Sequence, residues 1–192
     1  MTTLRSPKGA LWNACREKSC CRSSRVHVTG ADLARLVTTF ELAATAMVTA
    51  VEVDAGEPSG FRLCPSDPPS ELVLRKNGPI GPAGAPCIFL VETGDRHAIC
   101  GAGDAKPTSC QAFPAVAGPN GMTVLSRVCP CRTWSTSDIG ISERQWAKAA
   151  AMEEAEDAAA IQEWNSLVDA DGAPHTLGDF CDHLITSRTG PA

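Results

Sequence analysis

The sequence predicts an α+β protein: a small, irregular, cysteine-rich domain with long loops, followed by a C-terminal helical segment. Three observations predict this class. The chain has 10 cysteines among 192 residues. Short apolar stretches alternate with segments rich in Pro and Gly as far as residue 131. Near residue 140 the composition shifts to Ala and Glu, with apolar residues at helical spacing. We therefore predict two parts, residues 1–140 and residues 141–192.

The segment after the first cysteines predicts a short strand and then a helix. Val26 and Val28 alternate with His27, as they would in a strand. Thr29, with Asp32 three residues later, forms a capping box that starts a helix. Apolar residues then recur at helical spacing, so we expect an amphipathic helix whose apolar face belongs to the core: Leu33, Leu36, Val37, Phe40 and Ala44.

The middle of the chain predicts loops around short strands. Residues 55–86 contain repeated Pro and Gly, which favour turns, and "ELVLRK" within them predicts a strand. "CIFLV" at residues 87–91 predicts an apolar strand, and "TGD" shortly after it predicts a hairpin turn. "GAGDAKPTSC" at residues 101–110 predicts another loop.

Two helices are predicted in the last part. Ser142 and Gln145 form a capping box that opens a long helix to about residue 168, and "DADGAP" ends it. Thr176 and Asp179 start the final helix. The residues expected on the buried side of the first helix are Trp146, Ala150, Trp164, Leu167 and Val168. Those expected on one face of the second are Leu177, Phe180, Cys181, Leu184 and Ile185.

Composition argues against several classes of partner. The net charge of -5 and the lack of a Lys/Arg block argue against nucleic-acid binding. No apolar run reaches the roughly 18 residues of a membrane span. The N-terminal residues have no apolar segment typical of an export signal, so we expect a cytoplasmic protein.

The cysteines are the main functional signal. Thiols stay reduced in the cytoplasm, so many cysteines indicate metal ligands or redox chemistry there, whereas any single cysteine can also be a small core residue. Cys181 lies on an apolar helix face and Cys64 stands alone, so we expect neither to bind metal. The remaining candidate ligands are Cys15, Cys20, Cys21, Cys87, Cys100, Cys110, Cys129 and Cys131.

Spacing leaves the metal open. Zinc and iron–sulfur clusters each take four thiolates, so eight cysteines would fill two sites or one binuclear site, or five or six could surround one cluster. Adjacent side chains point apart, so we expect Cys20 and Cys21 not to bind one ion together. Cys129 and Cys131 flank Pro130, which favours an extended chain in which both sulfurs share one face.

Four blocks of the sequence resemble the YkgJ-like cysteine-cluster family. They are "CREKSCCRSSRVHVTGADLARL", "PCIFL", the region of Cys100, and "KPTSCQAFP", in the family's order and between residues 15 and 131. Cys20 and Cys21 match the family's adjacent pair, and Cys110 with Phe113 and Pro114 matches its last motif. Lys106 and Gln111 stand where the family usually has Arg.

The resemblance implies zinc or iron binding, and for some relatives an iron–sulfur cluster. We therefore expect residues 1–140 to form a cysteine-cluster metal-binding domain for redox chemistry or as part of an enzyme. A 4Fe–4S cluster is the first expectation, and a redox protein or an enzyme is the expected partner. Two alternatives stay open: a structural zinc protein, and a methyltransferase-like enzyme, because flagellin lysine-N-methylases carry a related cluster.

Overall fold

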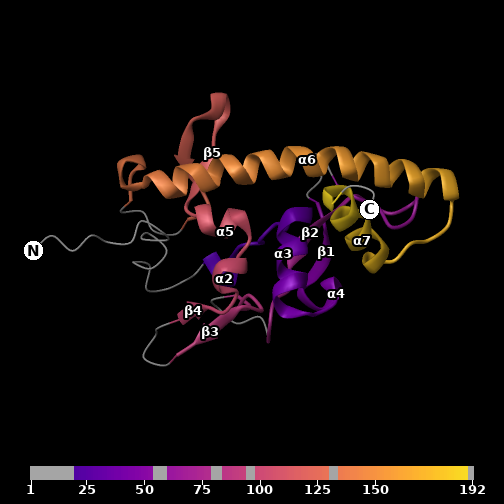
Figure 1. Ribbon diagram of the computed structural model, residues 1–192, viewed down its shortest axis with the longest axis horizontal. Coiled ribbons are helices and arrows are strands. Elements are labelled where there is room, and N and C mark those ends of the chain that lie inside the picture. Colours follow the sequence, from indigo (N-terminus) through magenta and orange to yellow (C-terminus); the bar gives the residue numbers. More distant parts are fainter. Residues whose placement is uncertain (1–19, 54–59, 79–83, 94–97, 130–133, 190–192) are drawn as a thin grey trace, which may run out of the picture. The chain divides into compact units, whose positions relative to one another are not determined.

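The computed structural model describes residues 20–53, 60–78, 84–93, 98–129 and 134–189. It confirms an α+β fold, with helices and three two-stranded antiparallel sheets among these residues (Figure 1). The chain divides into two compact units. Unit 1 contains Met1–Val26 and Lys76–Met152, and unit 2 contains His27–Arg75 and Glu153–Ala192. This division does not coincide with the predicted boundary at residue 140, because each unit contains two stretches of chain.

Unit 2 contains the longest sheet of the described residues. β1 (Val48–Glu52) pairs antiparallel with β2 (Ser70–Leu74), so that Val48 faces Leu74. The predicted strand in "ELVLRK" is therefore confirmed, whereas β1 was not predicted. The strand expected at residues 26–28 does not form. Only an isolated antiparallel β-bridge joins His27 to Val73, beside a hydrogen bond of 3.0 Å from the Val28 N–H to the Leu72 carbonyl. Val48 and Leu74 are buried, so the hairpin contributes one wall of the core of unit 2.

α3 (Gly30–Phe40) begins as the sequence predicts. The Thr29 side chain accepts a hydrogen bond from the Asp32 N–H, and the Asp32 side chain accepts one from the Thr29 N–H, which completes the capping box. The predicted helix reached Ala44, and this part of the prediction is wrong. Glu41 adopts a φ of 52°, which ends α3, and a separate short helix, α4 (Ala44–Met47), follows.

Two helices complete the C-terminal part, close to the predicted positions. α6 (Ile141–Asp171) ends before Gly172, whose φ of 68° favours glycine at a helix C-terminus. α7 (Leu177–Thr189) starts with hydrogen bonds between Thr176 and Asp179. Leu167, expected on the buried side of α6, is 50% exposed and is an error of the prediction. No helix in the described part of the chain is long and apolar enough to cross a bilayer.

Aromatic rings form the centre of unit 2. Phe61 and Phe180 stack with their ring centroids 3.8 Å apart, and the Trp164 ring meets Phe180 edge-on at 5.4 Å. Phe180 and its neighbour Cys181 are fully buried, which confirms the predicted face of α7. The Trp164 Nε1–H donates to the Arg62 carbonyl at 2.7 Å, so the one polar group of this ring is satisfied.

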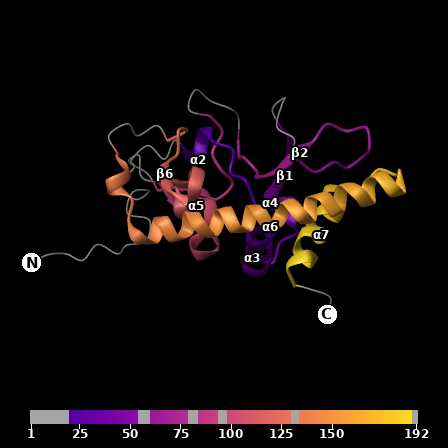
Figure 2. The same cartoon turned by 90° about the horizontal axis from the view of Figure 1, so that it is seen from above.

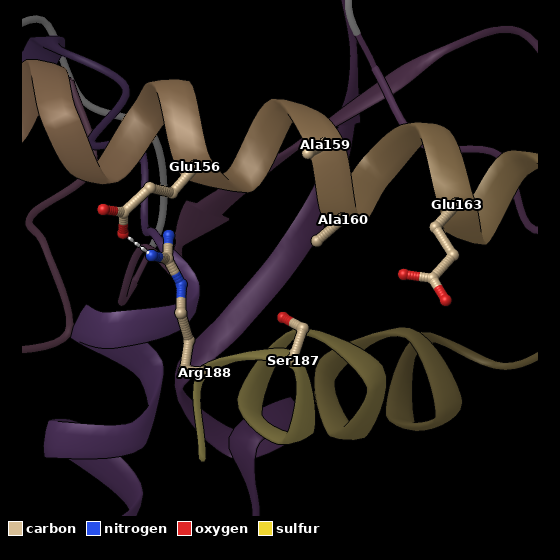
Figure 3. Close-up of a pocket in the computed structure, with 6 residues that line it drawn as sticks. All are labelled: Glu156, Ala159, Ala160, Glu163, Ser187 and Arg188. Atoms are coloured by element: carbon tan, nitrogen blue, oxygen red, sulfur yellow. Dashed lines mark hydrogen bonds and ion pairs between the residues drawn. The ribbon is translucent and has the colours of Figure 1, made fainter. Parts of the chain in front are cut away.

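An arginine on α7 connects it to the second half of α6 (Figure 3). Arg188 forms ion pairs with Glu156 and Asp157, and it donates a hydrogen bond to the Glu153 carbonyl at 2.8 Å. Asp157 in turn accepts a hydrogen bond of 2.8 Å from the Gly30 N–H at the start of α3. These contacts hold α3, α6 and α7 together inside unit 2.

Unit 1 is built from short elements around a small core. They are α2 (Cys20–Ser23), β3 (Leu90–Glu92), β4 (Ala98–Cys100), η1 (Gly103–Ala105), α5 (Thr108–Ala112), β5 (Ala115–Ala117), η2 (Pro119–Gly121), β6 (Thr123–Leu125) and η3 (Thr136–Asp138). Ala112 on α5 and Ala147 on α6 belong to one buried cluster of this core. In both views α5 lies beside α6 (Figures 1 and 2).

Two predictions for unit 1 need correction. The strand expected at residues 87–91 begins only at Leu90, because the two residues after Cys87 form a turn. The segment at residues 101–110, expected to be a loop, contains η1 and the start of α5. The expected hairpin is confirmed, because β3 pairs antiparallel with β4. Its turn at "TGD" extends beyond the described residues.

Candidate metal centre

Cys21 and Cys87 come from distant parts of the sequence and are held together by their backbones. The Cys87 N–H donates to the Cys21 carbonyl at 2.7 Å. The same carbonyl accepts a hydrogen bond of 3.3 Å from the Lys76 Nζ. Lys76 also forms an isolated antiparallel β-bridge with Cys87. Three segments therefore meet at this point of unit 1.

A glycine permits this close approach. Gly84 adopts a φ of 84°, which side chains other than glycine rarely tolerate, and a Cβ built there would lie 2.6 Å from the Arg22 carbonyl oxygen. The chain before Cys87 therefore passes directly over α2. A residue with a side chain at this position would push the two segments apart.

We accordingly expect Gly84→Ala to disturb this junction. The strained φ and the backbone clash together should lower stability by about 1–3 kcal/mol. Amide hydrogen exchange should accelerate at Cys87. Gly78→Ala is the matched control, because Gly78 also has a positive φ, of 79°, but a Cβ there would meet no atom of the described residues within 4 Å. Equal exchange at Cys87 in the two variants would contradict a packing role for Gly84.

A hairpin brings Cys100 to the same region. Cys100 on β4 faces Leu90 on β3, and the Leu90 N–H donates to the Cys87 carbonyl at 2.9 Å. The Gly101 N–H donates to the Phe89 carbonyl at 2.7 Å, which continues the pairing beyond the strands. The turn after Cys87 and the end of β4 are therefore side by side.

The thiols of Cys21 and Cys100 affect the pKa of Cys87, and the thiol of Cys21 affects that of Cys100. Burial raises the pKa of the Cys87 thiol. A hydrogen bond from the Phe89 N–H and the charge of Lys76 oppose this rise, whereas the Cys21 and Cys100 thiols add to it. Without a bound cation, Cys87 is therefore held as a neutral thiol. Each neighbouring thiolate would raise the pKa of Cys87 further, whereas a bound metal ion would lower it and favour the thiolate.

The environment of Cys100 repeats this pattern. Burial again raises its pKa, a hydrogen bond from the Ala102 N–H and the charge of Lys106 oppose the rise, and Cys21 adds to it. In both cases the N–H that meets the sulfur belongs to the second residue after the cysteine. Hydrogen bonds from N–H groups favour the thiolate form and tune metal–thiolate centres.

The adjacent pair differs from expectation. Cys20 and Cys21 both lie in α2, and their sulfurs are 3.9 Å apart, within hydrogen-bonding distance. The expectation that adjacent side chains point apart suits an extended chain, not a helix. In a helix, neighbouring side chains are only about 100° apart around the axis, so both sulfurs can turn to the same side.

The other candidate cysteines lie elsewhere in unit 1 or outside the described residues. Cys110 lies in α5, and Cys129 is buried after β6, both in unit 1. Cys15 and Cys131 lie outside the described residues. Within the described ranges, no three Cys, His, Asp or Glu side chains converge closely enough to hold a metal ion. The described ranges contain six of the candidate cysteines together with Cys64 and Cys181, and none of these eight forms a disulfide.

The two cysteines set aside as non-ligands belong to unit 2. Cys181 is fully buried in the core, as predicted, and burial raises its pKa to about 11. The Cys64 sulfur lies 3.4 Å from the Ser66 hydroxyl. That neither Cys64 nor Cys181 binds metal stays a prediction.

Sequence reasoning missed the two lysines. The positive charge of Lys76 lowers the pKa of the Cys87 thiol, and that of Lys106 lowers the pKa of the Cys100 thiol. Lys106 stands four residues before Cys110, where the YkgJ-like motif usually has Arg. That match could have indicated a positive charge near the cysteines. Lys76 follows a strand and had no such signal, since only the fold brings it beside Cys21.

The donor set suits a metal–thiolate centre. The thiols of Cys21, Cys87 and Cys100 come from separate segments, two of them receive backbone N–H groups, and two lysines offset negative charge. Thiolates select zinc, copper(I) and iron–sulfur clusters over harder cations. No protein-family model matches the chain, and no curated protein or solved structure is found to match it. The resemblance to the YkgJ-like family therefore stays a prediction.

Proposed function

We propose that unit 1 binds an iron–sulfur cluster through Cys21, Cys87, Cys100 and one further cysteine. The observation that carries this proposal is that a Cys87–Cys21 backbone hydrogen bond and the β3–β4 hairpin bring together cysteines from three segments of the chain. The fourth ligand comes from the remaining candidates: Cys15, Cys20, Cys110, Cys129 and Cys131.

The resemblance to the YkgJ-like family favours a cluster over a single zinc ion, because it implies an iron–sulfur cluster for some relatives. Each thiolate of a cluster can bind a different iron, so cysteines from separate segments can share it. Cys21, Cys87 and Cys100 come from three such segments of unit 1. A structural zinc site is the second candidate, favoured by the 3.9 Å between the Cys20 and Cys21 sulfurs.

The surrounding residues would stabilise the negative charge of the bound cofactor. The N–H groups of Phe89 and Ala102 and the ammonium groups of Lys76 and Lys106 stabilise negative charge on the thiolates. Such groups raise the reduction potential of a cluster by favouring its more negative, reduced state. We therefore propose a redox role, served by a partner protein or enzyme, in the reducing environment of the cytoplasm.

Purification without oxygen, followed by iron, zinc and acid-labile sulfide analysis, tests this proposal. A 4Fe–4S protein should be brown and should hold about four irons and four sulfides per chain. Zinc in a colourless protein would replace the iron–sulfur proposal with the structural one. Neither metal after expression with added iron and zinc would contradict metal binding altogether.

A further inference from the structure

Cys20 and Cys21 are adjacent, a feature that a cluster held by four thiolates does not need. Their sulfurs lie 3.9 Å apart on α2. Both residues are partly exposed, whereas Cys87 is buried. A small soluble disulfide can therefore reach the adjacent pair more readily than it can reach Cys87.

A disulfide between the two adjacent cysteines does not fit a helix. The S–S bond is about 2.05 Å long, so the two sulfurs must come much closer together than they are on α2. Cysteines joined by a disulfide have Cα atoms about 4.4–6.8 Å apart, whereas the Cα atoms of adjacent residues are about 3.8 Å apart. The bond is therefore strained, and the backbone at Cys20 and Cys21 has to change to accommodate it.

α2 has little stability of its own with which to oppose this change. The helix contains four residues, and none of them is buried. The Ser24 N–H donates to the Cys20 carbonyl at 3.1 Å, a hydrogen bond that belongs to the helical turn. A single turn gains few hydrogen bonds for the backbone entropy that it loses, so a new covalent bond can unwind it.

The backbone of α2 also supports the segment that carries Cys87. The Cys21 carbonyl accepts hydrogen bonds from the Cys87 N–H at 2.7 Å and from the Lys76 Nζ at 3.3 Å. One residue further along, the Arg22 carbonyl lies so close to Gly84 that a Cβ would not fit between them. A changed backbone at Cys21 therefore moves the carbonyl that satisfies the Cys87 N–H.

We propose that Cys20 and Cys21 form a redox switch in unit 1. In the reduced protein α2 is helical, and the Cys21 carbonyl holds the Cys87 N–H. In the oxidised protein a disulfide joins the two adjacent sulfurs, α2 unwinds, and the segments of Cys21 and Cys87 separate. Strained disulfides are reduced more readily than structural ones, so the switch is reversible.

The oxidant is a small soluble disulfide of the glutathione class. The thiolate of one cysteine attacks it, which forms a mixed disulfide and releases one glutathione. The neighbouring thiolate then attacks the protein sulfur of that mixed disulfide and releases the second glutathione. The two protons lost by the cysteines end on the two released thiols, so one disulfide is reduced as the other forms.

Oxidation of Cys21 also bears on metal binding. A sulfur in a disulfide is no longer a thiolate, so the oxidised pair cannot bind metal, and metal bound at Cys21 would protect the pair from oxidation. This consequence rests on the proposed function of unit 1. The disulfide itself does not, because it needs only the two adjacent thiols.

Mass spectrometry of the full-length protein after treatment with glutathione disulfide, with and without a chelator, tests the switch. Trypsin cuts after Lys18 and Arg22, so the peptide of residues 19–22 contains Cys20 and Cys21 and no other cysteine. With chelator and excess oxidant this peptide should become lighter by two hydrogens. Reduced glutathione should restore its mass.

Hydrogen exchange at the Cys87 amide measures the effect of the switch on the fold. This exchange should accelerate at least about tenfold in the oxidised protein, because the N–H loses the Cys21 carbonyl. In Cys20→Ser the exchange should not respond to glutathione disulfide. Cys64→Ser is the matched control, because Cys64 belongs to unit 2, and this variant should respond as the unaltered protein does.

Four outcomes would overturn the switch. They are a peptide that gains only glutathione in the presence of chelator, a disulfide that joins Cys21 to Cys87 instead, equal exchange at Cys87 in the oxidised and reduced protein, and the same response in Cys20→Ser. Slower oxidation without chelator than with it would support metal binding at Cys21. Equal rates would contradict that part of the proposed function and leave the switch intact.

Discussion

Replacing Cys21, Cys87 and Cys100 together by serine should leave the protein without bound metal. Serine hydroxyls stay protonated at neutral pH and are poor ligands for the metals that prefer thiolates. The remaining cysteines of unit 1 would then have to supply a complete site of four. We expect metal content per chain to fall at least about tenfold, measured after anaerobic purification.

The matched control for this variant is Cys64→Ala with Cys181→Ala. It also removes sulfur atoms, but both residues belong to unit 2, and Cys181 lies in a packed core. Its metal content should equal that of the unaltered protein. Unchanged metal in the serine variant, or lost metal in the alanine variant, would show that the ligands have been assigned wrongly. Circular dichroism should confirm that α6 and α7 remain helical in both.

Phe180→Ala should destabilise unit 2 more than any other single substitution considered above. The ring is fully buried, stacks on Phe61 and meets the edge of Trp164, so its removal leaves a cavity that helices cannot easily close. The expected loss is about 3–5 kcal/mol of unfolding free energy. Hydrogen exchange of the α7 amides should therefore accelerate by roughly a hundredfold or more.

Leu167→Ala is a suitable control on α6, because Leu167 is half exposed and its loss should change stability by less than about 0.5 kcal/mol. The double variant Phe61→Ala with Phe180→Ala should cost less than the sum of the single variants, since both remove the same stacking contact. A cost below about 1 kcal/mol for Phe180→Ala would contradict the view that this pair forms the centre of the core.

Helices were the most predictable part of the fold, because their signals are local. The capping boxes at Thr29 and Thr176 each involve residues three apart, and the face of α7 repeats within 13 residues. The sequence alone is therefore enough to place them. The break at Glu41 was not predictable, because a glutamate with positive φ has no sequence signature.

Strands were harder to predict because pairing depends on distant residues. β1 follows directly after α4, and its apolar residues Val48 and Val51 could equally continue a helix. Only pairing with β2, across an intervening segment, makes it a strand. The strand predicted at Cys87 was displaced for a related reason, since the Cys87 N–H bonds to the Cys21 carbonyl instead of a neighbouring strand.

The candidate site could also be predicted only in part, because it depends on contacts between distant residues. Counting cysteines and removing Cys64 and Cys181 predicted a set of eight, but spacing could not show which of them meet. Cys21, Cys87 and Cys100 become neighbours only through the β-bridge at Lys76 and the hairpin of β3 and β4. The lysines beside the thiols depend on the same long-range contacts.

The interleaving of the two units has a consequence for synthesis on the ribosome. Unit 1 has all its residues once Met152 has emerged, whereas unit 2 must wait for Glu153–Ala192. Its first stretch, which carries α3 and the β1–β2 hairpin, is made before the 77 residues from Lys76 to Met152. Its partner stretch, Glu153–Ala192, adds another 40 residues. At roughly 5–20 residues per second, the first stretch therefore waits about 6–23 s for unit 2 to be complete. Leu33 and Leu36, fully buried in the finished protein, stay exposed during this time. The nascent chain should therefore need chaperone protection over this interval, and Cys21 should reach Cys87 and Cys100 before unit 2 closes.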